Sequence, residues 1–185
     1  MKASLRYTLL IIGAIIFIIM IIPVFLPGDV TVEATTEMNA SPETVFHEVN
    51  VLRNWKAWSP FEDDSTMIDK YDGPDKGVGA KRTWTSRHLG NGNIVITKSV
   101  SGQLIRTKLD YGAPGAAEGR WTFTDDHGKT RVTWQLHILR LQYPFGKWLG
   151  LIMDKMMVPV LEKGLNNLKI KIEKRKAGSP VRIAH

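Results

Sequence analysis

The chain has 185 residues, no cysteine and a formal net charge of +7. The absence of cysteine excludes disulfide bonds and a thiolate nucleophile, although it does not identify a compartment. Because residues 169–182 hold six basic side chains against one acidic one and residues 29–168 are about neutral, the positive charge does not indicate a nucleic-acid-binding surface.

The first predicted element is an apolar run that carries no charged side chain between residues 7 and 28. Its core, Leu9–Leu26, would measure about 27 Å as a helix, close to the hydrocarbon thickness of a bilayer. Lys2 and Arg6 precede the run and acidic residues follow it. The positive-inside rule therefore predicts a single-pass membrane protein with its N-terminus in the cytoplasm and its domain outside.

Two other interpretations of this run are a cleaved signal peptide and a buried core helix. No small-residue cleavage pattern ends the run, and it is apolar on every side, so we favour an uncleaved anchor. The expected organisation is an anchor over residues 1–28, one domain over residues 29–176 and a disordered tail over residues 177–185. The domain would be periplasmic in a Gram-negative bacterium.

The domain begins with an alternating strand, Val30–Met38, and then a short helix. Ser41 suits an N-cap and Pro42 the first helical position, so this helix is expected to run to Val49. A second short helix is expected over residues 51–57, because the position before Pro60 disfavours helical geometry.

Six further strands and a long amphipathic helix complete the predicted order. Glycine- and asparagine-rich turns such as "HLGNGN" and "DDHGK" indicate antiparallel hairpins. The strands are expected over residues 67–71, 79–86, 93–100, 104–111, 117–124 and 130–138. Apolar residues then recur at three- and four-residue steps from Phe145 to Ile172, which predicts one helix.

This order predicts an α+β fold with a seven-stranded antiparallel sheet curled around a long C-terminal helix. Curling leaves a cavity between sheet and helix wherever the facing side chains do not fill it. The basic side chains of residues 169–182 either end this helix in solvent, which we favour, or contact anionic lipid headgroups.

The segments "NVLRNWKAWSPF", "YDGPDKGVGAKRTW" and "LEKGLNNLKIKIE", in this order, resemble the SRPBCC superfamily and most closely its polyketide cyclase/dehydrase-like branch. The resemblance covers most of residues 30–174. It implies the START-like helix-grip fold, with a hydrophobic-ligand cavity roofed by the C-terminal helix. Members include lipid carriers, hormone receptors, co-chaperones and a few cyclases. A membrane anchor is an addition to the shared domain.

The first candidate ligand-binding residues are Trp55, Trp58 and Phe61, where the chain crosses from the short helices toward the sheet. They would either form a lid at the cavity mouth or plug the end of the core. We favour the plug, because large aromatic side chains usually supply packing area.

Other candidates lie on strands and on the long helix. Strand periodicity predicts that the aromatic side chains face the helix, and the apolar spacing predicts that one side of the helix faces the sheet. These candidates are Trp84, Tyr111, Trp121, Trp134, Trp148, Ile152 and Met156.

Arg82 shares a strand face with Trp84, so it would point inward as well. There it would bind a ligand carboxylate or phosphate through bidentate hydrogen bonds. Alternatively it lies near the open end of its strand and extends to water, which we favour.

No catalytic or metal site is indicated. The five histidines are scattered, and no metal-ligand spacing occurs. The acidic cluster "EDDS" at residues 62–65 is interpreted as a solvated loop. No cofactor is expected.

Three functions remain. The favoured one is a membrane-anchored, extracytoplasmic, non-catalytic binding protein for a hydrophobic small molecule or lipid. The second is a cyclase/dehydrase-type or hydrolase-type enzyme that uses Arg82 with a cavity carboxylate or water. The third is a structural or stress-related interaction domain with a filled core. A cavity of a few hundred Å3 would favour the first two. The oligomeric state is not indicated.

Overall fold

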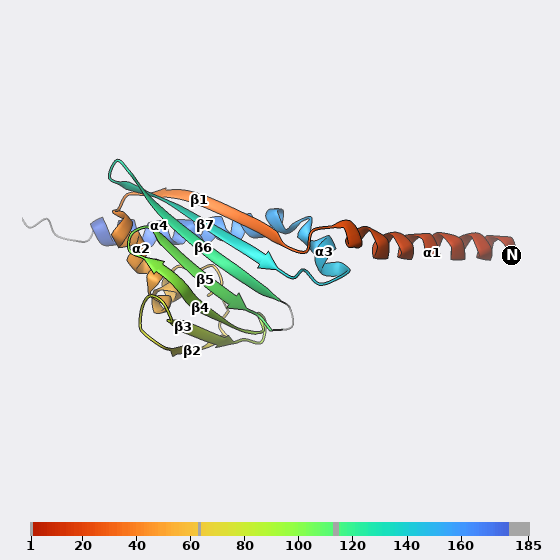
Figure 1. The fold of residues 1–185 in the computed structure, drawn as a ribbon, viewed down its shortest axis with the longest axis horizontal. Coiled ribbons are helices and arrows are strands. Elements are labelled where there is room, and N and C mark those ends of the chain that lie inside the picture. Colours follow the sequence, from red (N-terminus) through yellow and green to blue (C-terminus); the bar gives the residue numbers. More distant parts are fainter. Residues whose placement is uncertain (1, 63, 113–114, 178–185) are drawn as a thin grey trace, which may run out of the picture.

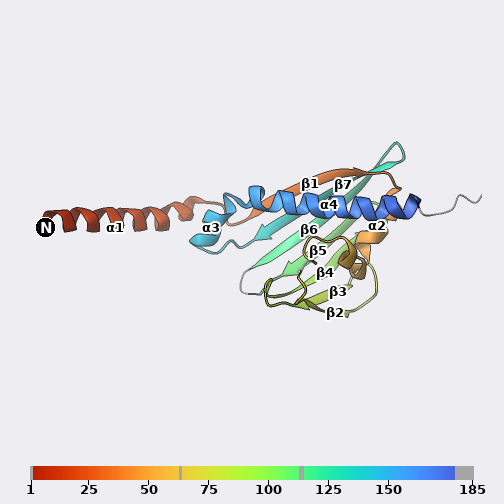
Figure 2. The same ribbon diagram turned by 180° about the vertical axis from the view of Figure 1, so that it is seen from behind.

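The computed structural model describes residues 2–62, 64–112 and 115–177, with side chains from residue 5 to 175. A long N-terminal helix projects from a single α+β body, and the last helix lies across one face of a twisted sheet (Figures 1 and 2). The elements in chain order are α1 (Lys2–Phe25), β1 (Val30–Met38), α2 (Pro42–Asn50), a 3-10 helix η1 (Leu52–Ala57), β2 (Ile68–Asp72), β3 (Lys81–Thr85), β4 (Asn91–Val100), β5 (Leu104–Asp110), β6 (Ala116–Asp126), β7 (Lys129–Leu139), α3 (Phe145–Gly150) and α4 (Met153–Ala177).

The seven strands form one antiparallel sheet in the order β1-β7-β6-β5-β4-β3-β2. Consecutive strands from β2 to β7 are neighbours, and β1 closes the far edge by pairing with β7. The helix-grip fold predicted from the sequence is therefore confirmed. Residues 178–185, which make up nearly all of the predicted tail, lie outside the described residues, and Ala177 ends α4.

The core lies between the sheet and α4. Leu161, Leu165, Leu168 and Ile172 follow one another at steps of four, three and four residues, and all are buried. This spacing places them on one side of the helix, which packs over β1. Gly164 lies on the same side, where an added Cβ would come within 2.8 Å of the Pro60 ring.

The two short helices form where the residue types predict them. The Ser41 side chain accepts a hydrogen bond from the Thr44 amide at 3.4 Å and so caps α2. Near the end of α2, Glu48 is buried and accepts hydrogen bonds from Lys171 at 2.6 Å and Arg175 at 3.1 Å. Two cations of the basic C-terminal segment are thus held by an ion pair to α2 and are not simply solvated.

The prediction of one continuous C-terminal helix from Phe145 was wrong. The chain forms a short helix, α3, and then a turn at Leu151 and Ile152 before α4 begins. Gly146 and Gly150 weaken the first part, since glycine in a helix costs about 1 kcal/mol relative to alanine. The break lets α3 leave the sheet and lie beside the end of α1 (Figure 1).

Candidate functional site

A cavity of about 310 Å3 lies between the sheet and the segments that cover it. Its lining residues gather toward the end of the sheet at which β3, β5 and β7 finish. Figure 1 shows that the chain continues from this end to α3. Its lining is predominantly apolar. The lining residues are Trp55, Ser59, Phe61, Glu62, Met67, Arg82, Trp84, Leu89, Ile94, Leu109, Tyr111, Gly115, Ala116, Ala117, Leu136, Ile138 and Met157.

Five of the predicted ligand-binding residues line this cavity: Trp55, Phe61, Arg82, Trp84 and Tyr111. Trp55 and Phe61 come from η1 and the loop after it, Arg82 and Trp84 from β3, and Tyr111 from the end of β5. Trp84 and Tyr111 meet edge to face, with ring centroids 5.8 Å apart. Phe61 also lines a neighbouring surface pocket, so it lies between the cavity and solvent.

Three predicted residues, Trp58, Trp121 and Trp134, are buried beside the cavity and do not line it. Trp121 and Trp134 are cross-strand partners on β6 and β7 and stack with centroids 4.2 Å apart. Trp58 meets both rings edge to face. Together with Trp55 they form a solid aromatic cluster, which we call the tryptophan plug. It fills the middle of the core and not its end. The plug interpretation of "NWKAWSPF" therefore holds for the burial of Trp58, whereas Trp55 and Phe61 line the cavity.

The tryptophan plug is fixed by one strong hydrogen bond, in which the Trp55 indole donates to the Val49 carbonyl at 2.8 Å. The Trp58 and Trp121 indole nitrogens are buried without a partner among the described residues. The packing of the large aromatic rings therefore stabilises this cluster by more than the two missing hydrogen bonds destabilise it.

The last three predicted residues, Trp148, Ile152 and Met156, do not line the cavity either. Trp148 belongs to α3, and the side chains of Ile152 and Met156 are about half exposed. The next residue, Met157, provides the lining instead. One residue along a helix turns the side-chain direction by about 100°, and the break before α4 changes which positions face the sheet.

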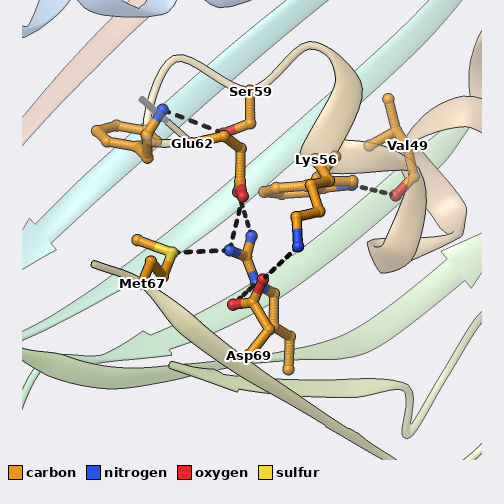
Figure 3. A network of polar contacts seen from close by, with 9 residues as sticks. Val49, Lys56, Ser59, Glu62, Met67 and Asp69 are labelled. Carbon is orange, nitrogen blue, oxygen red and sulfur yellow. Dashed lines mark hydrogen bonds and ion pairs between the residues drawn. The ribbon is translucent and has the colours of Figure 1, made fainter. Parts of the chain in front are cut away.

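The prediction that Arg82 extends to water was wrong. Its side chain is 6% exposed and forms two hydrogen bonds with the Glu62 carboxylate, one of them at 2.9 Å. Its Nε donates to Asp69 at 2.8 Å, and Nη2 lies 3.0 Å from the Met67 sulfur. Figure 3 shows Glu62 and Asp69 on opposite sides of the guanidinium group.

This cluster, Arg82 with Glu62 and Asp69, is hereafter the buried ion triad. Lys56 lies 3.9 Å from the second Asp69 oxygen and brings a further positive charge to its edge (Figure 3). Burial alone would lower the Arg82 pKa, but the hydrogen bonds to Glu62 and Asp69 outweigh burial and raise this pKa above its ordinary value. The two terminal nitrogens of Arg82, which would bind a ligand carboxylate or phosphate, are already hydrogen-bonded to the Glu62 carboxylate.

Sequence reasoning missed Glu62 and Asp69. Glu62 belongs to the "EDDS" cluster, but its side chain is only 9% exposed, so at this residue the interpretation as a solvated loop was wrong. Asp69 could have been found, because strand alternation places it on the same face as Met67 and Tyr71, beside the strand that carries Arg82.

Asp64 fixes a loop at the rim of the cavity. It accepts hydrogen bonds from the Ser86 hydroxyl and from Thr66, whose hydroxyl lies at 2.7 Å. These bonds stabilise the carboxylate and lower the Asp64 pKa to about 2. The Ser86 oxygen in turn accepts the amide of Leu89 at 2.8 Å, and Leu89 lines the cavity.

Tyr111 supplies the cavity with a neutral polar group. Burial raises the pKa of its phenol to about 12. The hydroxyl therefore stays protonated at any physiological pH, where it can donate a hydrogen bond to a guest. Within the part of the chain that the structure describes, no group of three or more histidine, aspartate and glutamate side chains could hold a metal ion.

Comparison with known proteins agrees with this geometry. The family described as "Polyketide cyclase / dehydrase and lipid transport" matches residues 29–173. No curated protein matches the sequence.

Solved structures resemble the domain in fold at low sequence identity. A protein of unknown function from Staphylococcus aureus has a TM-score of 0.62 at 15% identity, covering 80% of this chain and 98% of its own. TTHA0849 from Thermus thermophilus has a TM-score of 0.58 at 20% identity, with 80% and 99% covered. The di-domain ARO/CYC StfQ from the steffimycin biosynthetic pathway has a TM-score of 0.62 at 12% identity, with 80% and 52% covered.

Proposed function

The chain belongs to the polyketide cyclase / dehydrase and lipid transport family, and on that premise we propose that it is a membrane-anchored protein that holds an uncharged apolar small molecule or lipid. The observation that carries this proposal is the cavity of about 310 Å3 with its predominantly apolar lining. That volume is at the low end for ligand pockets, sufficient for one small guest or part of a longer chain. A purely structural domain would need a filled interior, so the cavity counts against it.

The charges around the cavity favour an uncharged guest. Arg82 uses both terminal nitrogens on Glu62 and its Nε on Asp69, which leaves little capacity to bind a ligand anion. The buried ion triad sums to one negative charge, which Lys56 offsets. Tyr111 stays neutral. Bringing a charged guest beside these groups would cost desolvation without a free partner.

The anchor is proposed from α1. The most apolar 18-residue window of Leu5–Phe25 has a mean hydropathy of 3.0, and only 6% of this window is buried against the protein. A membrane span and a signal sequence both satisfy this description. We favour an uncleaved span with residues 29–176 outside the cytoplasm, because Lys2 and Arg6 precede it. Since the chain has no cysteine, a single introduced cysteine at Lys129 would report the side of the domain to a membrane-impermeant thiol reagent in intact cells.

The test of binding is native mass spectrometry of the full chain released from detergent, with solvent extraction to identify any retained mass. Ala117 is buried and lines the cavity, so Ala117→Phe should fill the space and remove the bound species. The matched control is Thr124→Phe, an exposed position on the same strand. Lipids bound around α1 would remain in both variants. A species retained equally by Ala117→Phe and wild type is not in the cavity and would refute the proposal.

A second candidate function is a reaction of the cyclase or dehydrase type in the same cavity. The observation that favours it is Glu62, a carboxylate that lines an apolar cavity beside Arg82. The species identified by extraction is incubated with the protein and analysed again. Conversion that disappears in Glu62→Gln would establish this alternative, whereas release of the unchanged species supports binding alone.

A further inference from the structure

The segment around α3 exposes a concentration of large apolar side chains that the cavity does not use. Phe145 is 73% exposed, Leu151 57%, Ile152 48% and Leu149 42%. From residue 140 to residue 153 the only charged residues are Arg140 and Lys147, both basic. A continuous apolar stretch of this kind on a folded domain marks an interaction surface.

This segment is hydrogen-bonded to the C-terminal end of α1. The Tyr143 hydroxyl donates to the Met20 carbonyl, and the Trp148 indole donates to the Ile19 carbonyl at 3.1 Å. Lys147 donates to the Leu26 carbonyl at 2.8 Å. Figures 1 and 2 both show α3 beside the end of α1.

The bond from Trp148 has a specific cause. Pro23 lies inside α1 and has no amide hydrogen, so the Ile19 carbonyl, four residues earlier, lacks its helical donor. An unsatisfied carbonyl is strongly unfavourable in a bilayer, where no water can donate to it. The Trp148 indole supplies the missing donor. α3 therefore completes the hydrogen bonding of α1 at the level of Ile19.

The position of Ile19 gives the depth of α3. It lies six residues before Phe25, the last residue of α1, which corresponds to about 9 Å along the helix axis. If α1 spans a membrane with Phe25 at its edge, the bonded ends of Trp148 and Tyr143 reach about 9 Å below that edge, between the headgroups and the bilayer centre. Tryptophan and tyrosine are enriched in this outer part of a bilayer, because their rings are apolar and their polar ends hydrogen-bond.

We propose that residues 143–152, hereafter the interfacial foot, insert into the headgroup region of the bilayer with Phe145, Leu149 and Leu151 toward the acyl chains. The partner is the lipid surface, and Lys147 favours anionic headgroups. This inference rests on the proposed membrane anchor. The cavity occupies the end of the sheet that leads into the foot, so an apolar guest would pass between bilayer and cavity over a short path.

The experiment uses the full chain, whose lack of cysteine makes single spin labels specific. Labels are placed at Phe145→Cys, at Ile15→Cys in the middle of α1 and at Lys129→Cys in the distant β6–β7 hairpin, in vesicles of phosphatidylcholine and phosphatidylglycerol. Collisions with oxygen report contact with lipid, and collisions with a water-soluble nickel chelate report contact with water. We expect the ratio of oxygen to nickel collisions to be several-fold higher at Phe145 than at Lys129, and highest at Ile15.

Failure of the foot and failure of the anchor give different results. A lipid-like ratio at Ile15 with a water-like ratio at Phe145 would overturn the interfacial foot alone. Water-like ratios at both positions would overturn the anchor as well. Spin–spin broadening at Phe145, or low collision rates with both reagents, would show that a second copy or another protein covers the segment, and would also overturn the proposal.

Discussion

Replacing Arg82 with methionine tests whether the buried ion triad is held together as described. The side chains of Arg82, Glu62 and Asp69 are 6%, 9% and 6% exposed. Arg82→Met keeps most of the apolar stem but leaves two buried carboxylates without their shared cation. Removing one partner of a buried ion pair costs about 3–5 kcal/mol, mainly because the remaining charge stays desolvated. For a domain of this size, that loss lowers the melting temperature by roughly 6–20 °C.

The assay is thermal unfolding of the full chain in detergent, followed by the near-ultraviolet circular dichroism of the buried tryptophans. Arg106→Met is the matched control, because Arg106 lies exposed on β5 and its loss should change the free energy of unfolding by no more than about 0.5 kcal/mol. Adding Glu62→Gln and Asp69→Asn to Arg82→Met removes the unpaired charges and should recover part of the loss. If Arg82→Met unfolds at the same temperature as Arg106→Met, the triad is not a buried ion cluster.

Three further predictions follow from single contacts. Burial raises the Tyr111 pKa to about 12, whereas the same phenol in the unfolded chain ionises near 10.0, so the folded state holds more protons between these values. The free energy of unfolding should therefore fall as the pH rises from 10 to 12, and it should fall less in Tyr111→Phe. The low Asp64 pKa predicts the opposite pH dependence. The ionised Asp64 stabilises the folded state above pH 3.8, and this stabilisation is lost as the pH falls toward 2. In acid unfolding followed by tryptophan fluorescence, the free energy of unfolding should therefore fall less steeply with pH in Asp64→Asn. Gly164→Ala should destabilise by about 1–3 kcal/mol in urea unfolding, since its Cβ would lie 2.8 Å from Pro60 and 2.9 Å from Trp134, whereas Asn166→Ala on the exposed side of α4 should not.

Much of the fold could be predicted because its determinants are local. Alternation along each strand identified the inward face, and glycine-rich turns identified the hairpins. The apolar spacing from Leu161 to Ile172 identified the helix that covers the sheet. The plug interpretation of Trp58 was right for a similar reason, because a large aromatic residue beside a core segment is most stable when fully packed.

The candidate site was harder to predict, because it depends on contacts between distant segments. Arg82 and Glu62 are 20 residues apart and meet only when the loop before β2 folds over β3. The acidic composition of the "EDDS" cluster favoured a solvated loop, because local composition gives no information about a buried cation on another strand. Met157 lines the cavity because it lies four residues before Leu161, on the buried side of α4. The spacing counted from Trp148 and Ile152 selected Met156 instead, because it assumed one continuous helix across the break.

The helices α1 and α3 and the cavity lie at one end of the molecule for a single topological reason. Short connections, residues 26–29 and 140–144, join α1 to β1 and β7 to α3, so the paired ends Val30 and Ile138 hold both connections together. Ile138 also lines the cavity, whereas the tryptophan plug closes the core farther along the same strands. With α1 as the proposed membrane anchor, an apolar space that is closed on its distant side and lies near α1 is placed to exchange a guest with the bilayer. The neutral Tyr111 and the self-paired Arg82 then favour uncharged molecules, which are the molecules that a bilayer interior dissolves.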